Sequence, residues 1–272
     1  RGITTGNNEF FLLSKKDALD FKLPEYLLAP TVSSTREIET LSISEENIEK
    51  CLFLCPFSLS ELSQMDMKPA VDYIKRFASE KTSKQGKHTK AGVSITQAST
   101  LKGRKQWWTL NDKRGGHLVI PRLLRERFYI ATNETHRIRT TDMFFNIVFN
   151  EGIDVEVASA LANSAITYFF IEILGRINVG GRINFYGPEI QELLLIKPTL
   201  FEGIKRAELL ERFYFLQSKK IEMIRNEVND PKRIAFDRYV FETAGIADLY
   251  DSVVKYLISS VSQRVSREKD IS

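Results

Sequence analysis

The sequence has no apolar run long enough to cross a lipid bilayer, because a spanning helix needs about 20 mostly apolar residues. The longest apolar neighbourhood, residues 160–174, is shorter and is interrupted by Asn163, Ser164, Thr167 and Glu172. A leader with a basic start and an apolar centre is also missing, and the chain begins at Arg1 rather than at a methionine. We therefore expect a fragment of a longer cytoplasmic protein.

Cysteine and histidine are too scarce for a disulfide framework or a zinc centre to be expected. The two cysteines lie in "CLFLC", where alternation along a strand places Cys51 and Cys55 on one face with Phe53. This pattern favours two reduced thiols in the protein core over a metal or disulfide site. The three histidines have no ligand spacing, so no bound metal is expected.

Glycine and proline are also infrequent, with 14 and 8 residues, which excludes a fibrous or largely disordered chain. The 272 residues, of which 43% are hydrophobic and 27% charged, are typical of a globular protein. At roughly 100–200 residues per domain, this length allows one large domain or two ordinary ones.

The positive charge is concentrated in one quarter of the chain. Residues 75–140 contain 16 lysines and arginines against 4 acidic residues, whereas the whole chain has a net charge of only +4. Most charged runs are solvated faces of the protein. A cationic excess this uneven also fits a protein that neutralises phosphates through one region.

The hydrophobic pattern predicts an α+β fold, with a β-rich core, a long central helix and a helical C-terminal tail. Short strands are predicted at residues 7–13, 51–57, 106–110 and 192–198 and within residues 117–150, and the loop 84–105 is basic. A long helix is predicted from Asp154 to Arg176, and helices continue after residue 200. Asp230-Pro231 is typical of a helix start, and Gly245 of a hinge. We expect an α+β domain over residues 1–200 and a helical region over residues 201–272.

Several segments resemble, in order, the C-terminal target-recognition (specificity) region of gamma-class N(6)-adenine DNA methyltransferases of bacterial restriction-modification systems. The resemblance spans nearly the whole chain. It departs from the family at the usual triple glycine, which is "VGGR" here, and at Ala162 in place of the usual leucine. The segments that carry it are "RGITTGNNEFF", "YLLAPTVSSTREI", "VDYIKRF", "GRKQWWTL", "ALANSAITYFFIEILGRINVGGRINFYGPEIQELLLIKP" and "RIAFDRYVFETAGI".

The resemblance implies a part that binds double-stranded DNA while an upstream methyltransferase domain of the same polypeptide carries out the chemistry. Such enzymes use an Asn/Asp-Pro-Pro-Tyr/Phe segment for the flipped adenine and a glycine-rich loop for S-adenosylmethionine, and this chain has no Pro-Pro pair and no Gly-x-Gly. We therefore expect no catalytic residue and no cofactor here, with S-adenosylmethionine bound upstream. The alternative is a protein-interaction module of a restriction-modification complex, with a possible dimer through the C-terminal helices.

The candidate DNA-binding residues are polar or cationic and come from four segments. Each segment also has a structural interpretation: a polar turn at the start of the chain, strand packing around Trp107 and Trp108, a solvated face, or pairing of Arg176 with a helix C-terminus. Arg104 is a candidate for phosphate contact or for bidentate recognition of guanine. The full set is Thr5, Asn7, Asn8, Lys102, Arg104, Lys105, Arg122, Arg125, Arg127, Arg176 and Arg182.

Overall fold

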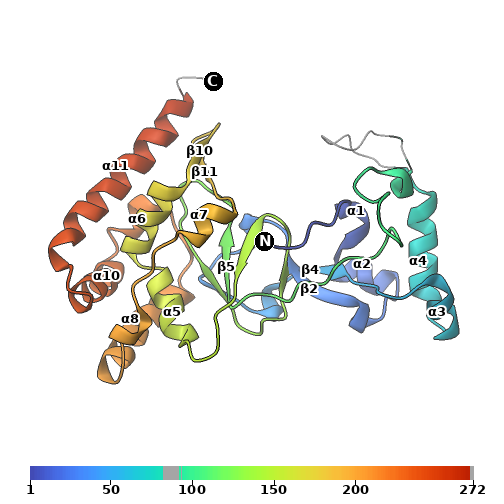
Figure 1. Ribbon diagram of the computed structural model, residues 1–272, viewed down its shortest axis with the longest axis horizontal. Helices are drawn as coiled ribbons and strands as arrows, with labels where there is room; N and C mark the ends of the chain where they lie inside the picture. The colour runs from blue at the N-terminus through green and yellow to red at the C-terminus, as the bar shows by residue number, and fades with distance from the viewer. Residues whose placement is uncertain (82–91, 93, 270–272) are drawn as a thin grey trace.

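The computed structural model describes residues 1–81, 92 and 94–269, and it has two lobes, each with its own hydrophobic core (Figure 1). The core of the N-terminal lobe draws on residues 3–28 and 51–110. The core of the C-terminal lobe draws on residues 32–48 and 118–265. The chain therefore crosses from one core to the other three times, and residues 139–140 of the second core's segment also pair with the sheet of the N-terminal lobe.

The N-terminal lobe is built on a four-stranded sheet with the order β1-β4-β2-β8. The β1, β4 and β2 strands are antiparallel, and the short β8 strand pairs with β2 in parallel. The elements are α1 (Asn8–Phe11), β1 (Leu12–Ser14), α2 (Lys15–Asp20), η1 (Glu25–Leu27), β2 (Leu28–Val32), β4 (Lys50–Phe53), α3 (Leu59–Gln64), α4 (Lys68–Ser79), η4 (Ile95–Gln97) and β8 (Arg139–Thr140).

The C-terminal lobe contains two further sheets, ordered β3-β7-β5-β9 and β10-β11-β6. Its strands are β3 (Ser42–Ile43), β5 (Leu118–Pro121), β6 (Leu123–Leu124), β7 (Ala131–Asn133), β9 (Phe144–Ile147), β10 (Arg176–Asn178) and β11 (Arg182–Asn184). Its helices are η2 (Thr35–Glu37), η3 (Glu45–Asn47), α5 (Val155–Ala162), α6 (Ala165–Leu174), α7 (Gly187–Gln191), η5 (Pro198–Leu200), α8 (Ile204–Ser218), α9 (Ile224–Glu227), α10 (Pro231–Thr243), η6 (Ala247–Leu249) and α11 (Tyr250–Lys269). Together the elements confirm the α+β class.

The first residues of the chain join the two lobes. The backbone N–H of Gly2 donates to the carbonyl oxygen of Phe144 at 2.9 Å, and Ile3 forms a parallel bridge with Thr141. A Cβ atom at Gly2 would lie 2.2 Å from the carbonyl oxygen of Thr141. Only glycine allows this close approach, which gives "RG" at the start of the chain a structural role.

The two cysteines and two tryptophans belong to the core of the N-terminal lobe. Cys51 and Cys55 are buried free thiols, as expected, and burial raises the pKa of both. Trp108 is buried and its indole Nε1–H donates to the carbonyl oxygen of Phe57 at 3.1 Å. Trp107 packs against Phe10, with ring centroids 4.5 Å apart. The expectation that at least one tryptophan is a core residue is confirmed.

Several strand predictions are wrong in whole or in part, and of the predicted strand 51–57 only residues 51–53 lie in a strand. Residues 106–110 form a turn, closed by a hydrogen bond from the Thr109 N–H to the Gln106 carbonyl oxygen at 3.1 Å. Residues 8–11 form α1 because the Asn7 side chain caps it, and only Leu12–Ser14 is a strand. Residues 192–198 have no regular structure up to η5. Part of the predicted basic loop 84–105 lies outside the described residues.

The predicted long central helix is broken into α5 and α6, which meet at a bend of 62°. Asn163 and Ser164 form the break, and the Asn163 side chain bonds both the N–H and the carbonyl oxygen of Ile130, at 3.0 and 2.7 Å. Asn163 thus ties the break to the chain that enters β7. A polar side chain with backbone partners in the core competes with the helix for hydrogen bonds, which explains the interruption.

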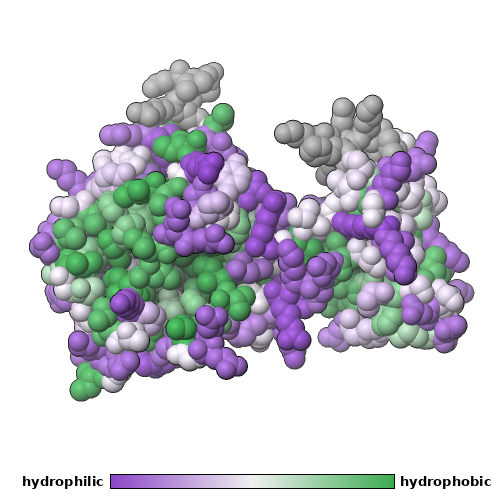
Figure 2. All heavy atoms as spheres, in the orientation of Figure 1, coloured by the Kyte–Doolittle hydropathy of each residue, from purple (hydrophilic) through white to green (hydrophobic). Residues whose placement is uncertain are grey.

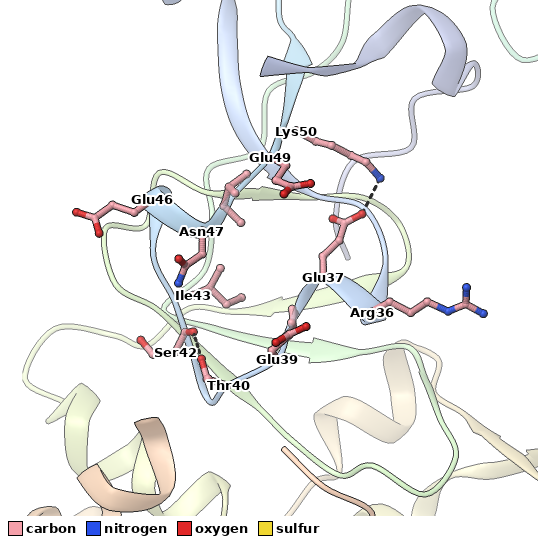
Figure 3. A pocket seen from close by; sticks show the side chains of 12 residues that line it. Arg36, Glu37, Glu39, Thr40, Ser42, Ile43, Glu46, Asn47, Glu49 and Lys50 are labelled. Atoms are coloured by element: carbon pink, nitrogen blue, oxygen red, sulfur yellow. Dashed lines mark hydrogen bonds and ion pairs between the residues drawn. The ribbon is translucent and has the colours of Figure 1, made fainter. Parts of the chain in front are cut away.

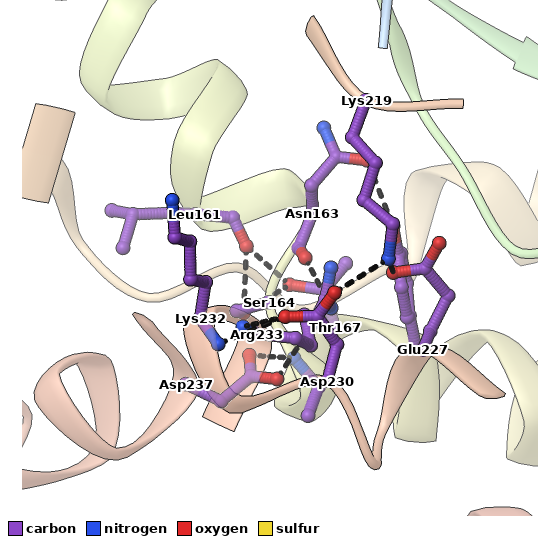
Figure 4. Close-up of polar contacts among 12 residues, drawn as sticks. Leu161, Asn163, Ser164, Thr167, Lys219, Glu227, Asp230, Lys232, Arg233 and Asp237 are labelled. Atoms are coloured by element: carbon purple, nitrogen blue, oxygen red, sulfur yellow. Dashed lines mark hydrogen bonds and ion pairs between the residues drawn. The ribbon is translucent and has the colours of Figure 1, made fainter. Parts of the chain in front are cut away.

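A buried ion pair holds this break against α10 (Figure 4). The Arg233 guanidinium donates to the Asp237 carboxylate at 2.7 Å and to the Asn163 carbonyl oxygen at 2.6 Å. The Asp237 carboxylate also accepts the N–H of Ala165 at 2.7 Å, at the start of α6. Both side chains are desolvated, since only 3% and 1% of their surfaces are exposed.

The C-terminal helices pack into the same core as the sheets of their lobe. Asp230 caps α10 and Pro231 begins it, as predicted, and Gly245 adopts a left-handed conformation with φ of +72° between α10 and η6. The helices on both sides of residue 200 share this core. The domain boundary expected at residue 200 stays a prediction.

Of the helices described, none is by itself long and apolar enough to cross a bilayer. Only α5 and α6 taken together reach the required length and composition.

Replacing Asp237 with alanine leaves the Arg233 charge buried without its partner. We expect Asp237→Ala to lower the free energy of unfolding by about 3–5 kcal/mol. The matched control is Asp251→Ala, which removes an exposed pair with Arg238 and is expected to cost less than about 1 kcal/mol. Urea unfolding of both variants measures the difference. Equal losses would contradict the structural role of the buried pair.

Candidate functional site

The eleven candidate residues fall into two groups on different lobes. The segments that carry Thr5, Asn7, Asn8, Lys102, Arg104 and Lys105 pack on the N-terminal core, next to Phe10, Leu101 and Trp108. The segments that carry Arg122, Arg125, Arg127, Arg176 and Arg182 pack on the C-terminal core. The fold therefore does not collect the candidate residues into one patch.

Most of the first group has structural partners. The hydroxyl of Thr5 donates to the side-chain oxygen of Asn8, and the side-chain oxygen of Asn7 accepts the N–H of Phe10 at 2.9 Å. These bonds shape the turn into α1, as the structural interpretation of this segment requires. Lys102 and Lys105 are exposed.

Arg104 points back into its own lobe. Its guanidinium donates to the carbonyl oxygens of Thr5 and Thr109, at 2.7 and 3.2 Å, and lies 5.3 Å from the centre of the Phe11 ring. Burial lowers the pKa of this guanidinium. These contacts favour a role in joining the start of the chain to residues 100–109 over a role in reading bases.

In the second group, three arginines line one pocket of about 360 Å³. A fourth arginine, Arg36 from η2, lines the same pocket, and the walls include one carboxylate, Glu126. The remaining wall is mainly apolar, with Leu123, Leu124, Tyr129, Met143 and Met223. We call this site, formed by Arg36, Arg125, Arg127 and Arg182 and their neighbours, the arginine pocket.

The arginines of the pocket differ in how firmly they are held. Arg127 donates to the carbonyl oxygen of Ile38 at 2.8 Å and lies 5.6 Å from the ring centre of Tyr129, and its buried Nε has no hydrogen-bond partner among the described residues. Arg36 and Arg182 are exposed. Arg127 thus anchors the pocket wall, whereas Arg36 and Arg182 can turn toward an anion.

Arg122 and Arg176 do not line the pocket. The Nε of Arg122 donates to the side-chain oxygen of Asn184 in β11 at 3.4 Å, which ties the β5–β6 turn to the β10–β11 hairpin. Arg176 pairs with Glu189 at 2.5 Å and lies 5.2 Å from the ring centre of Tyr186. Burial raises the pKa of the Glu189 carboxyl, but hydrogen bonds from backbone N–H groups and from Arg176 outweigh burial and lower it. This carboxylate therefore stays ionised and paired at neutral pH.

Arg36 is the member that sequence reasoning missed. It lies in "YLLAPTVSSTREI", a segment quoted for the family resemblance, but it falls outside the cationic quarter of the chain. In Figure 3 its side chain extends away from the neighbouring ion pair between Glu37 and Lys50, whose atoms are 2.7 Å apart. Its place in that family motif, rather than the local charge, is the feature of the sequence that could have identified Arg36.

A larger pocket of about 590 Å³ lies beside η2, inside the loop formed by residues 36–50 (Figure 3). Its walls include the carboxylates of Glu37, Glu39, Glu46 and Glu49. Burial raises the pKa of the Glu37 carboxyl, but hydrogen bonds from Lys50 and from the Ser33 hydroxyl outweigh burial and lower it below its ordinary value. An acidic wall repels a polyanion, so this pocket does not suit DNA.

Comparison with known proteins gives a family match and similar solved structures. The family model described as "Type II methyltransferase M.Eco57I, C-terminal domain" matches residues 1–231. The crystal structure of the type IIG restriction endonuclease BpuSI is similar in fold, with a TM-score of 0.58 and 17% sequence identity. The similarity covers 94% of this chain and 30% of the BpuSI chain. Among the curated proteins, none matches.

Because of the contacts that Arg104 makes within its own lobe, we expect loss of its side chain to lower the stability of the protein. Arg104→Ala leaves the carbonyl oxygen of Thr5 without its donor, and we expect the free energy of unfolding to fall by about 1–3 kcal/mol. Lys102→Ala removes an exposed charge two residues away and is expected to change it by less than about 0.5 kcal/mol. Chemical denaturation measures both. An unchanged stability of Arg104→Ala would show that its contacts are dispensable.

Proposed function

Because the chain belongs to the family of C-terminal domains of the type II methyltransferase M.Eco57I, we propose that it is the DNA target-recognition domain of a site-specific N(6)-adenine DNA methyltransferase or of a fused restriction-modification enzyme. The chain binds duplex DNA and positions it. It matches 30% of the BpuSI chain. We place the methyltransferase domain, its S-adenosylmethionine and any endonuclease in other parts of the parent polypeptide.

The observation that carries this proposal is the arginine pocket. Four arginines from η2, from the segment around β6 and from β11 line one site, where Glu126 is the single carboxylate among the described lining residues. Guanidinium groups suit phosphate because their planar donors bind two oxygens at once. Contacts of this kind fix the position and orientation of a protein on the duplex, and they supply much of the binding free energy at low salt.

The N-terminal lobe supplies a second set of cations. Lys102 and Lys105 are exposed on the lobe opposite the arginine pocket, and hydrophilic residues occupy the region where the lobes join (Figure 2). We place the duplex against both lobes, with phosphates at the arginine pocket and at these lysines. In the parent enzyme, the adenine would then be flipped into the catalytic domain. Such an enzyme works in the cytoplasm, where its DNA is.

A second candidate function, a protein-interaction module, is favoured by a different observation. Figure 2 shows a broad hydrophobic area on the C-terminal lobe. Large apolar side chains of this lobe that remain exposed include Ile153, Ile173, Leu194 and Leu200. Contiguous apolar surface of this kind is typical of an interface with another protein. The methyltransferase domain or a second copy of the chain would cover it, and either is compatible with DNA binding elsewhere.

Removing a pocket arginine should weaken DNA binding through the loss of a phosphate contact. For Arg36→Ala and for Arg182→Ala, we expect lower affinity on duplexes of any sequence and a salt slope reduced by about 1 per residue. The control is Arg238→Ala, which removes an exposed arginine of α10 that pairs with Asp251. Fluorescence anisotropy of a labelled duplex at several salt concentrations gives both quantities. If both pocket variants bound as tightly as Arg238→Ala, the pocket would not be the DNA contact.

A further inference from the structure

The α11 helix carries a buried arginine that bonds the backbone of two segments of the arginine pocket. Arg264 is only 3% exposed, although it lies five residues before the end of the last helix. Its guanidinium pairs with the buried carboxylate of Glu172 in α6, through Nε at 2.9 Å and Nη2 at 3.1 Å. The hydroxyl of Ser260 donates to the same carboxylate at 2.8 Å. The ion pair is therefore bidentate and desolvated.

The remaining donors of Arg264 reach two backbone carbonyl groups. Nη1 donates to the carbonyl oxygen of Gly181, and Nη2 donates to the carbonyl oxygen of Arg125. Gly181 directly precedes Arg182, and Arg125 is itself a pocket residue. One buried guanidinium thus joins the two segments that carry the exposed side of the arginine pocket.

The hairpin turn is shaped to meet this helix. Gly181 has a φ of +58°, and a Cβ atom there would lie 2.3 Å from the carbonyl oxygen of Arg264. The adjacent strand β11 pairs with β6, with Ile183 opposite Leu124. The turn therefore lies directly against α11 while its second strand continues into the pocket wall.

Stability alone does not explain a charged group at this position. A buried ion pair gives little net stabilisation compared with well-packed apolar residues, because desolvation offsets the attraction. Its directional bonds, however, fix the relative positions of the groups that it joins. Here those groups are the helix α6, the hairpin turn and the segment after β6.

We propose that Arg264 is a positioning residue that sets the spacing of Arg125 and Arg182 for phosphate binding. This inference rests on the proposed DNA-binding function of the pocket. The guanidinium does not touch DNA. It acts on affinity by holding the backbone on either side of the pocket, so that the exposed guanidinium groups meet a phosphate together.

The test compares Arg264→Lys with Arg233→Lys in the 272-residue chain. Each variant replaces a buried arginine that pairs with a carboxylate in the C-terminal lobe. Lysine keeps the charge but cannot donate to all the acceptors that arginine reaches. Circular dichroism and thermal unfolding establish that each variant is folded at the assay temperature. Anisotropy with a labelled duplex, over a series of salt concentrations, then reports affinity and salt slope.

We expect Arg264→Lys to weaken duplex binding by about tenfold, the size expected for one lost hydrogen bond to a charged group, and to lower the salt slope. Arg233→Lys should lose stability but keep both quantities. In the double variant Arg264→Lys/Arg182→Ala, the loss of affinity should be smaller than the product of the two single losses, because both act on one contact.

Different failures have different meanings. If Arg182→Ala weakens binding while Arg264→Lys binds like Arg233→Lys, or if the double variant shows the full product of the losses, the positioning role is wrong and the DNA-binding function stands. If Arg182→Ala itself leaves affinity and salt slope unchanged, Arg182 does not contact the duplex and the positioning role is wrong. If Arg36→Ala leaves them unchanged as well, the pocket does not bind DNA.

Discussion

Among the described residues of the C-terminal lobe, Arg233 and Arg264 bury their guanidinium groups, and the placement of its surface elements depends on how these charges are neutralised. A charge out of water needs both a counter-ion and acceptors for its remaining donors. Arg233 finds Asp237 and the backbone at the break between α5 and α6. Arg264 finds Glu172 and two carbonyl groups beside the arginine pocket. Buried charge in the core therefore determines the geometry of the surface above it.

Some cations of the chain bond to the protein itself, and others remain exposed to solvent. Arg104 and Arg127 bond carbonyl oxygens of their own lobes, and Arg139 pairs with Asp112 through two hydrogen bonds, at 2.7 and 2.8 Å. Arg36 and Arg182 remain exposed, and both lie outside the cationic quarter. A count of charges along the sequence thus overstates the cations that can meet a polyanion, and it misses two that can.

The sequence predicted the elements whose causes are local and missed those whose causes lie elsewhere in the fold. The α+β class, the start of α10 at Asp230-Pro231 and the family follow from patterns within short segments. The break at Asn163 depends on its bonds to Ile130, which is far away in sequence. One pocket arginine was similarly hidden, because nothing around Arg36 in the chain indicates that it lines a pocket with Arg182. Nothing around Arg264 indicates that it bonds the carbonyl oxygen of Gly181. Residues 106–110 alternate like a strand, but tertiary packing of the two indoles makes them a turn.

The proposed function makes duplex binding a property of this chain rather than of the parent enzyme alone. Sedimentation velocity of the 272-residue chain, with and without a labelled duplex at low salt, tests this most directly. A target-recognition domain moves the label to a faster-sedimenting species, and added salt reverses the shift because released counterions drive the association. A chain that forms a dimer without DNA, and that leaves the duplex at its free sedimentation rate at every salt concentration, would contradict the proposal and favour a protein-interaction module.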